Sequence, residues 1–141
     1  MTDTRPPHPR TPDEWQAAAV GTLLERTGIA LGEVGPDRAT GSMPVAGNTQ
    51  PAGLLHGGAT AALAETLGSV AAQVHAGPDR AAVGIELSIT HHRGVREGTV
   101  HGTATAVHQG RSTVSYEIVV VDDVGRRVAT ARLTCMVLEA R

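Results

Sequence analysis

The 141-residue chain contains no lysine, no phenylalanine and only one residue each of tryptophan, tyrosine and cysteine. Without lysine, Schiff-base chemistry and a Walker-type phosphate site have no amine to use. Two aromatic residues, Trp15 and Tyr116, provide no platform on which single-stranded nucleic acid can stack. The lone Cys135 excludes an internal disulfide and a cysteine-rich metal site, and it fits a reducing compartment.

Charge and hydropathy indicate the cellular compartment and exclude two classes of binding partner. The formal net charge is -2 and the pI is about 6.4, so no broad positive field attracts a nucleic-acid backbone. No apolar stretch has the uncharged length needed to cross a bilayer, and residues 1–11 lack the apolar core of a signal peptide. We therefore expect a cytoplasmic protein with no membrane or nucleic-acid partner.

The length and the 40% apolar content suit one domain with one core. Residues 1–11 combine charges with three prolines, so we expect a flexible N-terminal tail followed by a single domain over residues 12–141. Start and stop signals predict a short helix over residues 12–26, a hairpin from 29–34 and 38–45, and a helix over 56–75 that is apolar on almost every face. Extended segments are predicted after residue 79, at 99–109, 112–121 and 127–138.

These elements predict an α+β fold in which a five- to six-stranded antiparallel sheet wraps one long central helix, with a short N-terminal helix beside it. Alternation along the first long strand places Val83, Ile85, Leu87 and Ile89 in one row that should face the helix. His91 continues this row and is expected to reach the space beside the helix, whereas His92 points the other way.

The most anomalous residue is Glu65, because its carboxylate lies in the middle of an apolar helix and must lose much of its hydration. Ser69 lies one helical turn further along, Gly58 two turns earlier, and Gln73 one turn beyond Ser69. The only polar seam on this helix therefore runs through Glu65.

The start of the same helix has backbone N–H groups that can polarise a carbonyl group. His56, Gly57 and Gly58 leave backbone N–H groups and the positive end of the helix dipole uncovered, which favours a developing oxyanion. Asn48 and Gln50, in the turn before the helix, supply amides that can orient a water or a carbonyl. An acid, an oxyanion site and orienting amides together indicate acyl transfer to water.

Structural explanations exist for each of these residues. Glu65 can be a carboxylate tied to an arginine of the sheet or to a partner's surface. His56 can be only a helix cap, and the two glycines can serve only close packing of helix on sheet. Their occurrence within 16 residues favours the catalytic interpretation.

Residues 48–59 (NTQPAGLLHGGA) and 64–69 (AETLGS) resemble the signature of hotdog-fold acyl-CoA thioesterases. The resemblance is closest to the branch of hydroxybenzoyl-CoA, dihydroxynaphthoyl-CoA and aryl-carrier proofreading thioesterases, which pairs a Gln before the motif with a Glu on the helix. Many other members carry Asn and Asp there, so Gln50 and Glu65 argue against a phenylacetyl-type enzyme. The likeness extends less sharply over residues 12–138.

The resemblance implies an obligatory dimer, and a tetramer beyond it, in which each active site draws on two protomers. Glu65 would be the general base or the nucleophile, and the Gly57 N–H of the opposing subunit would polarise the thioester carbonyl. Gln50 and His56 would position the carbonyl and the attacking water, with Ser69 beside the carboxylate. No metal and no cofactor are implied, because coenzyme A is part of the substrate.

Further residues are expected to bind the substrate. Those predicted near the acyl group are Asn48, Gly58, Val83, Gly84 and His91, and those predicted near the coenzyme A phosphates or pantetheine are Arg93, Arg111 and Ser112. The sequence thus predicts a thioesterase that hydrolyses aromatic or hydroxyaromatic acyl-CoA, with an acyl-carrier thioester as the other form of substrate. A hotdog dehydratase or enoyl-CoA hydratase and a non-catalytic acyl-CoA binding module remain as alternatives.

Overall fold

The computed structural model describes residues 8–139, so most of the predicted tail (residues 1–7) and residues 140–141 lie outside the described part. All strands form one antiparallel sheet in the order β1-β2-β4-β5-β6-β3. The expected α+β plan is confirmed, with six strands. The helices are α1 (Pro12–Ala18), α2 (Leu23–Thr27) and α3 (Gly57–Ala76), and the strands are β1 (Ala30–Val34), β2 (Arg38–Pro44), β3 (Arg80–His91), β4 (Thr99–Gln109), β5 (Thr113–Val121) and β6 (Arg127–Glu139).

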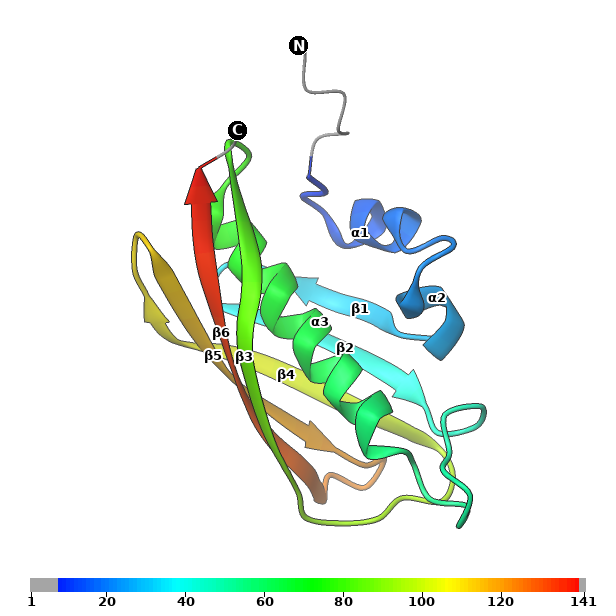
Figure 1. Ribbon diagram of the computed structural model, residues 1–141. Coiled ribbons are helices and arrows are strands. Elements are labelled where there is room, and N and C mark those ends of the chain that lie inside the picture. Colours follow the sequence, from blue (N-terminus) through cyan, green and yellow to red (C-terminus); the bar gives the residue numbers. More distant parts are fainter. Residues whose placement is uncertain (1–7, 140–141) are drawn as a thin grey trace.

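Helix α3 lies against the inner face of the sheet, which curls around it (Figure 1). The helix begins after His56, whose ring caps the first turn, and ends at Gly77, which has a φ of 83°. Pro78 follows and prevents the helix from continuing. Both ends lie within one residue of the prediction because both carry local chemical signals.

The core forms where α3 meets the sheet. Leu63 and Leu67 on the helix and Leu133 on β6 are completely buried, and each such side chain stabilises the fold by about 2 kcal/mol. Gly68 permits close approach, since a Cβ built there would lie 2.6 Å from Cδ2 of Leu133. The helix is therefore held tightly against β6, which fixes the height of its side chains above the sheet.

The predicted N-terminal helix is wrong in one respect, because residues 12–26 form two short helices. Gly21 adopts a φ of 76°, a left-handed conformation that interrupts the helix, and Thr22 starts the second one. Gly28, with a φ of 75°, ends α2 as the sequence predicted.

The predicted row on β3 is also wrong in its first half. Val83 and Ile85 are exposed, at 41% and 54%, whereas Leu87 packs against the core. The reason is a β-bulge at Ile85, which inserts one residue and exchanges the two faces of the strand. Alternation read from sequence fails wherever such an extra residue occurs.

Candidate active site

Glu65 lies at mid-helix on α3 with its carboxylate against β3. The contact is made at Gly84, where an added Cβ would overlap Oε1 of Glu65. Burial removes water from the carboxylate and raises its pKa above the ordinary value of 4.5. Within residues 8–139 no arginine forms an ion pair with this carboxylate, so the sheet-arginine explanation finds no support there. Glu65 is thus a partly desolvated carboxylate with no cationic partner in the described part of the chain.

A buried thiol adjoins this carboxylate, and sequence reasoning did not associate the two. Cys135 on β6 pairs with Gly84 across the β3–β6 ladder. Burial and the charge of Glu65 raise the thiol pKa to about 11, and a hydrogen bond with Ser69 opposes the shift. Cys135 is therefore a neutral thiol at pH 7. Only the pairing of β3 with β6 brings it here, and no local sequence signal encodes that pairing.

Ser69 hydrogen-bonds with the thiol of Cys135, whereas Gln73 has a structural role. Gln73 Nε2 donates to the carbonyl oxygens of Gly77 (3.2 Å) and Arg80 (2.9 Å), and its Oε1 accepts from the N–H of Ala82 (3.0 Å). These bonds fasten the end of α3 to the start of β3. The polar seam beyond Ser69 is therefore structural.

The N-terminus of α3 divides its donors between a cap and open space. The N–H of Gly58 donates to Nδ1 of His56 at 2.8 Å, so the ring proton resides on Nε2 and the Gly58 donor is already used. The N–H of Gly57 donates to no acceptor among residues 8–139. The free donor of this helix is therefore Gly57, the one predicted to polarise a carbonyl.

The ring of His91 lies beside Gly57. A Cβ built on Gly57 would lie 2.9 Å from Nε2 of His91, so the ring occupies the space left by the glycine. His92 points to the other face of the sheet, where its Nε2 lies 3.0 Å from Oγ1 of Thr130. The expected opposite orientation of the two histidines is confirmed, and His91, Gly57 and His56 gather at one end of α3.

The loop before α3 carries the two predicted amides in different environments. Asn48 Nδ2 donates to the carbonyl oxygens of Thr27 (2.7 Å) and Pro44 (2.8 Å), so its amide anchors the loop. Gln50 Oε1 accepts from the N–H of Ala52 and leaves its own amide N–H groups free of any partner within residues 8–139. Gln50 is thus the better placed of the two to donate to a substrate.

The remaining predicted residues do not gather around Glu65 within one chain. Val83 lies on the outer face of the sheet, away from α3, which contradicts its expected orientation. Arg93 is exposed in the loop after β3. Arg111 and Ser112 lie in the β4–β5 turn at the C-terminal end of α3, where His75 Nε2 contacts the carbonyl of Gly110 at 2.9 Å.

Gly57 and Glu65 lie far apart within one chain. Gly57 and Glu65 are eight residues apart on the same rigid helix, which separates their backbones by about 12 Å along its axis. A carbonyl next to the Glu65 carboxylate is therefore out of reach of the Gly57 N–H of the same chain. If both groups act on one carbonyl, two protomers must contribute them.

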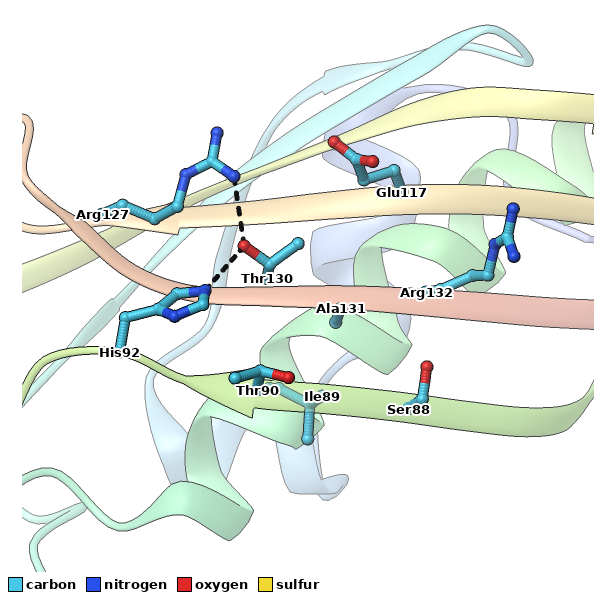
Figure 2. A pocket seen from close by; sticks show the side chains of 9 residues that line it. All are labelled: Ser88, Ile89, Thr90, His92, Glu117, Arg127, Thr130, Ala131 and Arg132. Carbon is cyan, nitrogen blue, oxygen red and sulfur yellow. Dashed lines mark hydrogen bonds between the residues drawn. The ribbon is translucent and has the colours of Figure 1, made fainter.

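A separate hollow lies on another part of the described surface. It has a volume of about 490 Å³ and opens on the outer face of β3, β5 and β6, opposite α3 (Figure 2). Arg127, Arg132 and Glu117 surround it, and Arg127 donates to Oγ1 of Thr130 at 3.2 Å. It is separated from Glu65 by the sheet and is not the candidate active site.

The described part of the chain contains neither a cluster of metal ligands nor a membrane-spanning helix. Between residues 8 and 139, no three side chains of His, Cys, Asp or Glu gather in a way that suits a metal ion. None of the helices in this part combines the length and the apolar character needed to span a membrane.

Comparisons with known proteins identify the family of this chain. The family model of the Thioesterase superfamily matches residues 52–129. The chain is 46% identical over 123 residues to the proofreading thioesterase EntH of Cronobacter sakazakii, and the match covers 86% of this chain and 90% of that protein.

Solved structures give the same result. Thioesterase HI1161 from Haemophilus influenzae has a TM-score of 0.88 and 30% identity, covering 94% of this chain and 93% of its own. A mutant of thioesterase PA1618 from Pseudomonas aeruginosa has a TM-score of 0.88 and 34% identity, covering 94% and 96%. Since the family model spans the helix that carries Glu65 and the relatives cover nearly the whole chain, this chain belongs to the thioesterase superfamily, has its hotdog fold and is a thioester hydrolase.

Proposed function

We propose that this thioesterase hydrolyses aromatic or hydroxyaromatic acyl-CoA thioesters to the free acid and coenzyme A. Glu65 is the base or nucleophile, and the Gly57 N–H of a second protomer polarises the thioester carbonyl. The observation that carries the proposal is the desolvated, unpaired Glu65 carboxylate at the polar seam of α3. A carboxylate with a raised pKa is a stronger base than a carboxylate in water. Because the Glu65 carboxylate has no structural partner, a role in catalysis explains its position better than a role in folding.

The aromatic acyl group is supported by the combination of Gln50 and Glu65. This pair resembles the branch that acts on aryl thioesters, and the similar Cronobacter sakazakii protein is named a proofreading thioesterase. Coenzyme A and carrier-protein thioesters share the pantetheine arm, so the proposal covers both, with coenzyme A as the first to test. No cofactor or metal is required, because a thiolate is a good leaving group.

The reaction follows from these positions. The Gly57 N–H of the second protomer donates to the carbonyl oxygen, on which negative charge grows as the carbonyl carbon is attacked. Glu65 either takes a proton from the attacking water or attacks the carbon itself and forms an anhydride that water then cleaves. In both routes the C–S bond breaks, the thiolate leaves and a carboxylic acid is released. Gln50 and the Nε2–H of His56 are donors that orient the carbonyl and the water.

The dimer in this proposal rests on the axial separation of about 12 Å, eight helical residues, between Gly57 and Glu65 in one chain. A second protomer would also bring Arg93, Arg111 or Ser112 toward the same substrate, where arginine and hydroxyl donors suit the coenzyme A phosphates. The resemblance extends the assembly to a tetramer. The single cysteine suits action in the cytoplasm.

The test is thiol release from benzoyl-, hydroxybenzoyl-, hydroxynaphthoyl-, phenylacetyl- and straight-chain acyl-CoA, measured for the native chain and for Glu65→Gln. Gln keeps the size and polarity of the side chain, but its uncharged amide cannot act as a base or as a carboxylate nucleophile. We expect aryl-CoA to be the preferred substrate class and Glu65→Gln to lower kcat by about 1,000-fold or more with an unchanged melting temperature. Faster release from straight-chain substrates would refute the aromatic assignment, and retained turnover in Glu65→Gln would remove Glu65 from its role.

A further inference from the structure

Strand β3 faces α3 with even-numbered residues before Ile85 and with odd-numbered residues after it. The exchange is caused by one extra residue in the strand. Gly84 pairs with Cys135, and Glu86 pairs with Thr134, the next residue of β6, so Ile85 has no partner in the ladder. Paired residues of neighbouring strands lie on the same face. Gly84 therefore shares the inner face with the buried Cys135.

Beyond the bulge the inner face passes to odd-numbered residues. Leu87 pairs with the buried Leu133, and His91 pairs with the buried Ala129. His91 indeed contacts Gly57 at the start of α3. In a strand without a bulge, residues 84 and 91 would point to opposite faces, because their separation is an odd number. Only the extra residue allows Gly84 and His91 to face the same helix.

The two residues meet the two chemically active parts of that helix. Gly84 faces the Glu65 carboxylate, and His91 faces Gly57. Gly84 does not have a positive φ, so its backbone conformation does not require glycine. What requires glycine is the carboxylate, because a Cβ at this position would overlap Oε1 of Glu65.

We propose that Gly84 is a positioning residue for Glu65: its missing side chain, presented by the bulge at Ile85, is the recess that seats the carboxylate and sets its direction toward the substrate. This inference rests on the proposed role of Glu65 and deepens it. Gly84 itself touches no reacting atom and acts only through the carboxylate. The recess is lined on its far side by the thiol of Cys135 and the core side chain of Leu133.

The test is a double-mutant cycle of Gly84→Ala with Glu65→Asp. Gly84→Ala adds one methyl group and displaces the glutamate carboxylate, and displacements of this size lower kcat by about 10- to 100-fold. Aspartate is one methylene shorter and does not reach the added methyl group. We therefore expect Glu65→Asp to lower activity by itself, and the further addition of Gly84→Ala to that variant to change kcat by less than about twofold.

Three readouts distinguish positioning from a structural role. Gly84→Ala should lower kcat and leave KM unchanged, and it should melt within about 4 °C of the native chain. Ser88→Ala, on the outer face of the same strand, is the matched control and should leave kcat unchanged. A larger loss of melting temperature, or an equal loss of kcat whether Gly84→Ala is made in the native chain or in the Glu65→Asp variant, would show that Gly84 serves packing and would overturn the proposal.

The outcome also separates this proposal from the one before it. If Glu65→Gln remains active, the proposed function fails whatever Gly84→Ala does. If Glu65→Gln is inactive while Gly84→Ala keeps native kcat, the proposed function stands and the positioning role of Gly84 is overturned.

Discussion

Glu65 occupies a site where its ionised form has lost part of its water and gained no cation in return among residues 8–139. Desolvation therefore raises its pKa above 4.5, because the neutral acid is easier to bury than the anion. The same environment makes the carboxylate more basic than it would be in water. One residue thus links a structural observation to the reaction.

The pH dependence of activity follows from that shift. If Glu65 acts as base or nucleophile, it must be ionised, so kcat/KM should fall as the pH decreases through the raised pKa of Glu65. We expect the acid limb of the log(kcat/KM) profile to have a slope of one and an inflection above pH 4.5. A pH series of thiol release measures it. An inflection at or below pH 4.5 would contradict the desolvated environment of Glu65.

At this scale the sequence predicts which residues are unusual but not what they touch. Glu65 stands out because a carboxylate is rare inside an apolar helix, and Gly57 because it begins that helix, where backbone N–H groups have no partner within the helix. Neither signal contains the contact between Glu65 and Gly84 or the neighbouring thiol of Cys135. Those contacts depend on the pairing of β3 with β6, which is a long-range property of the sheet.

At the scale of elements, His56 caps the N-terminus of α3, and its proposed role toward the substrate uses the other ring nitrogen. Its Nδ1 accepts from the N–H of Gly58, and its Nε2–H is left to donate to a substrate or water. Asparagine is a strong N-cap residue with a side-chain acceptor, whereas alanine has none. The two functions of His56 are therefore separable by substitution.

We expect His56→Ala to lower the free energy of unfolding by about 1 kcal/mol, and His56→Asn to change it by only a few tenths. Both variants should lose thiol-release activity, because neither presents the imidazole Nε2–H. Chemical denaturation and kinetic assays of the two variants test this. Native activity in His56→Asn would assign His56 to capping alone, the simpler explanation considered from the sequence.

The difference between local signals and long-range pairing explains which elements can be predicted from the sequence. The bounds of α3 follow from a cap at one end and Gly77-Pro78 at the other, all local signals. The bulge at Ile85 has no such signal: its sequence is a regular alternation, and the extra residue is accommodated only because β6 pairs differently on its two sides. The break at Gly21 is intermediate, since glycine permits the left-handed turn without requiring it.

At the scale of the whole molecule, the two groups that the proposed reaction needs lie at different heights on one helix. The free N–H of Gly57 and the carboxylate of Glu65 lie about 12 Å apart along one helix, eight residues of rise. The β4–β5 turn with Arg111 and Ser112 adjoins the other end of that helix (Figure 1). A copy with its α3 antiparallel to the first, and displaced so that Gly57 of each helix lies beside Glu65 of the other, would bring the two groups together. The sequence indicates such a dimer only through resemblance, whereas the helix length gives a physical reason for it.

Subunit complementation tests this arrangement directly. Glu65→Gln removes the carboxylate, and Gly57→Pro removes the N–H donor at a first helical position, where the proline backbone is compatible with the helix. The proline ring also requires the His91 side chain to move. Each homodimer should be inactive. A mixed dimer contains one site in which both substitutions meet and one site with native Glu65 from one protomer and native Gly57 from the other.

With random pairing, half of the dimers are mixed and each has one native site, so co-expressed or co-refolded variants should regain about a quarter of native kcat per chain. Thiol release after mixing measures the recovery, and a mixture of Glu65→Gln with itself is the control. If both groups came from the same protomer, a mixed dimer would contain no native site and the mixture would stay inactive. Recovery of activity therefore requires that the Gly57 amide of one chain and the Glu65 carboxylate of another act on the same thioester.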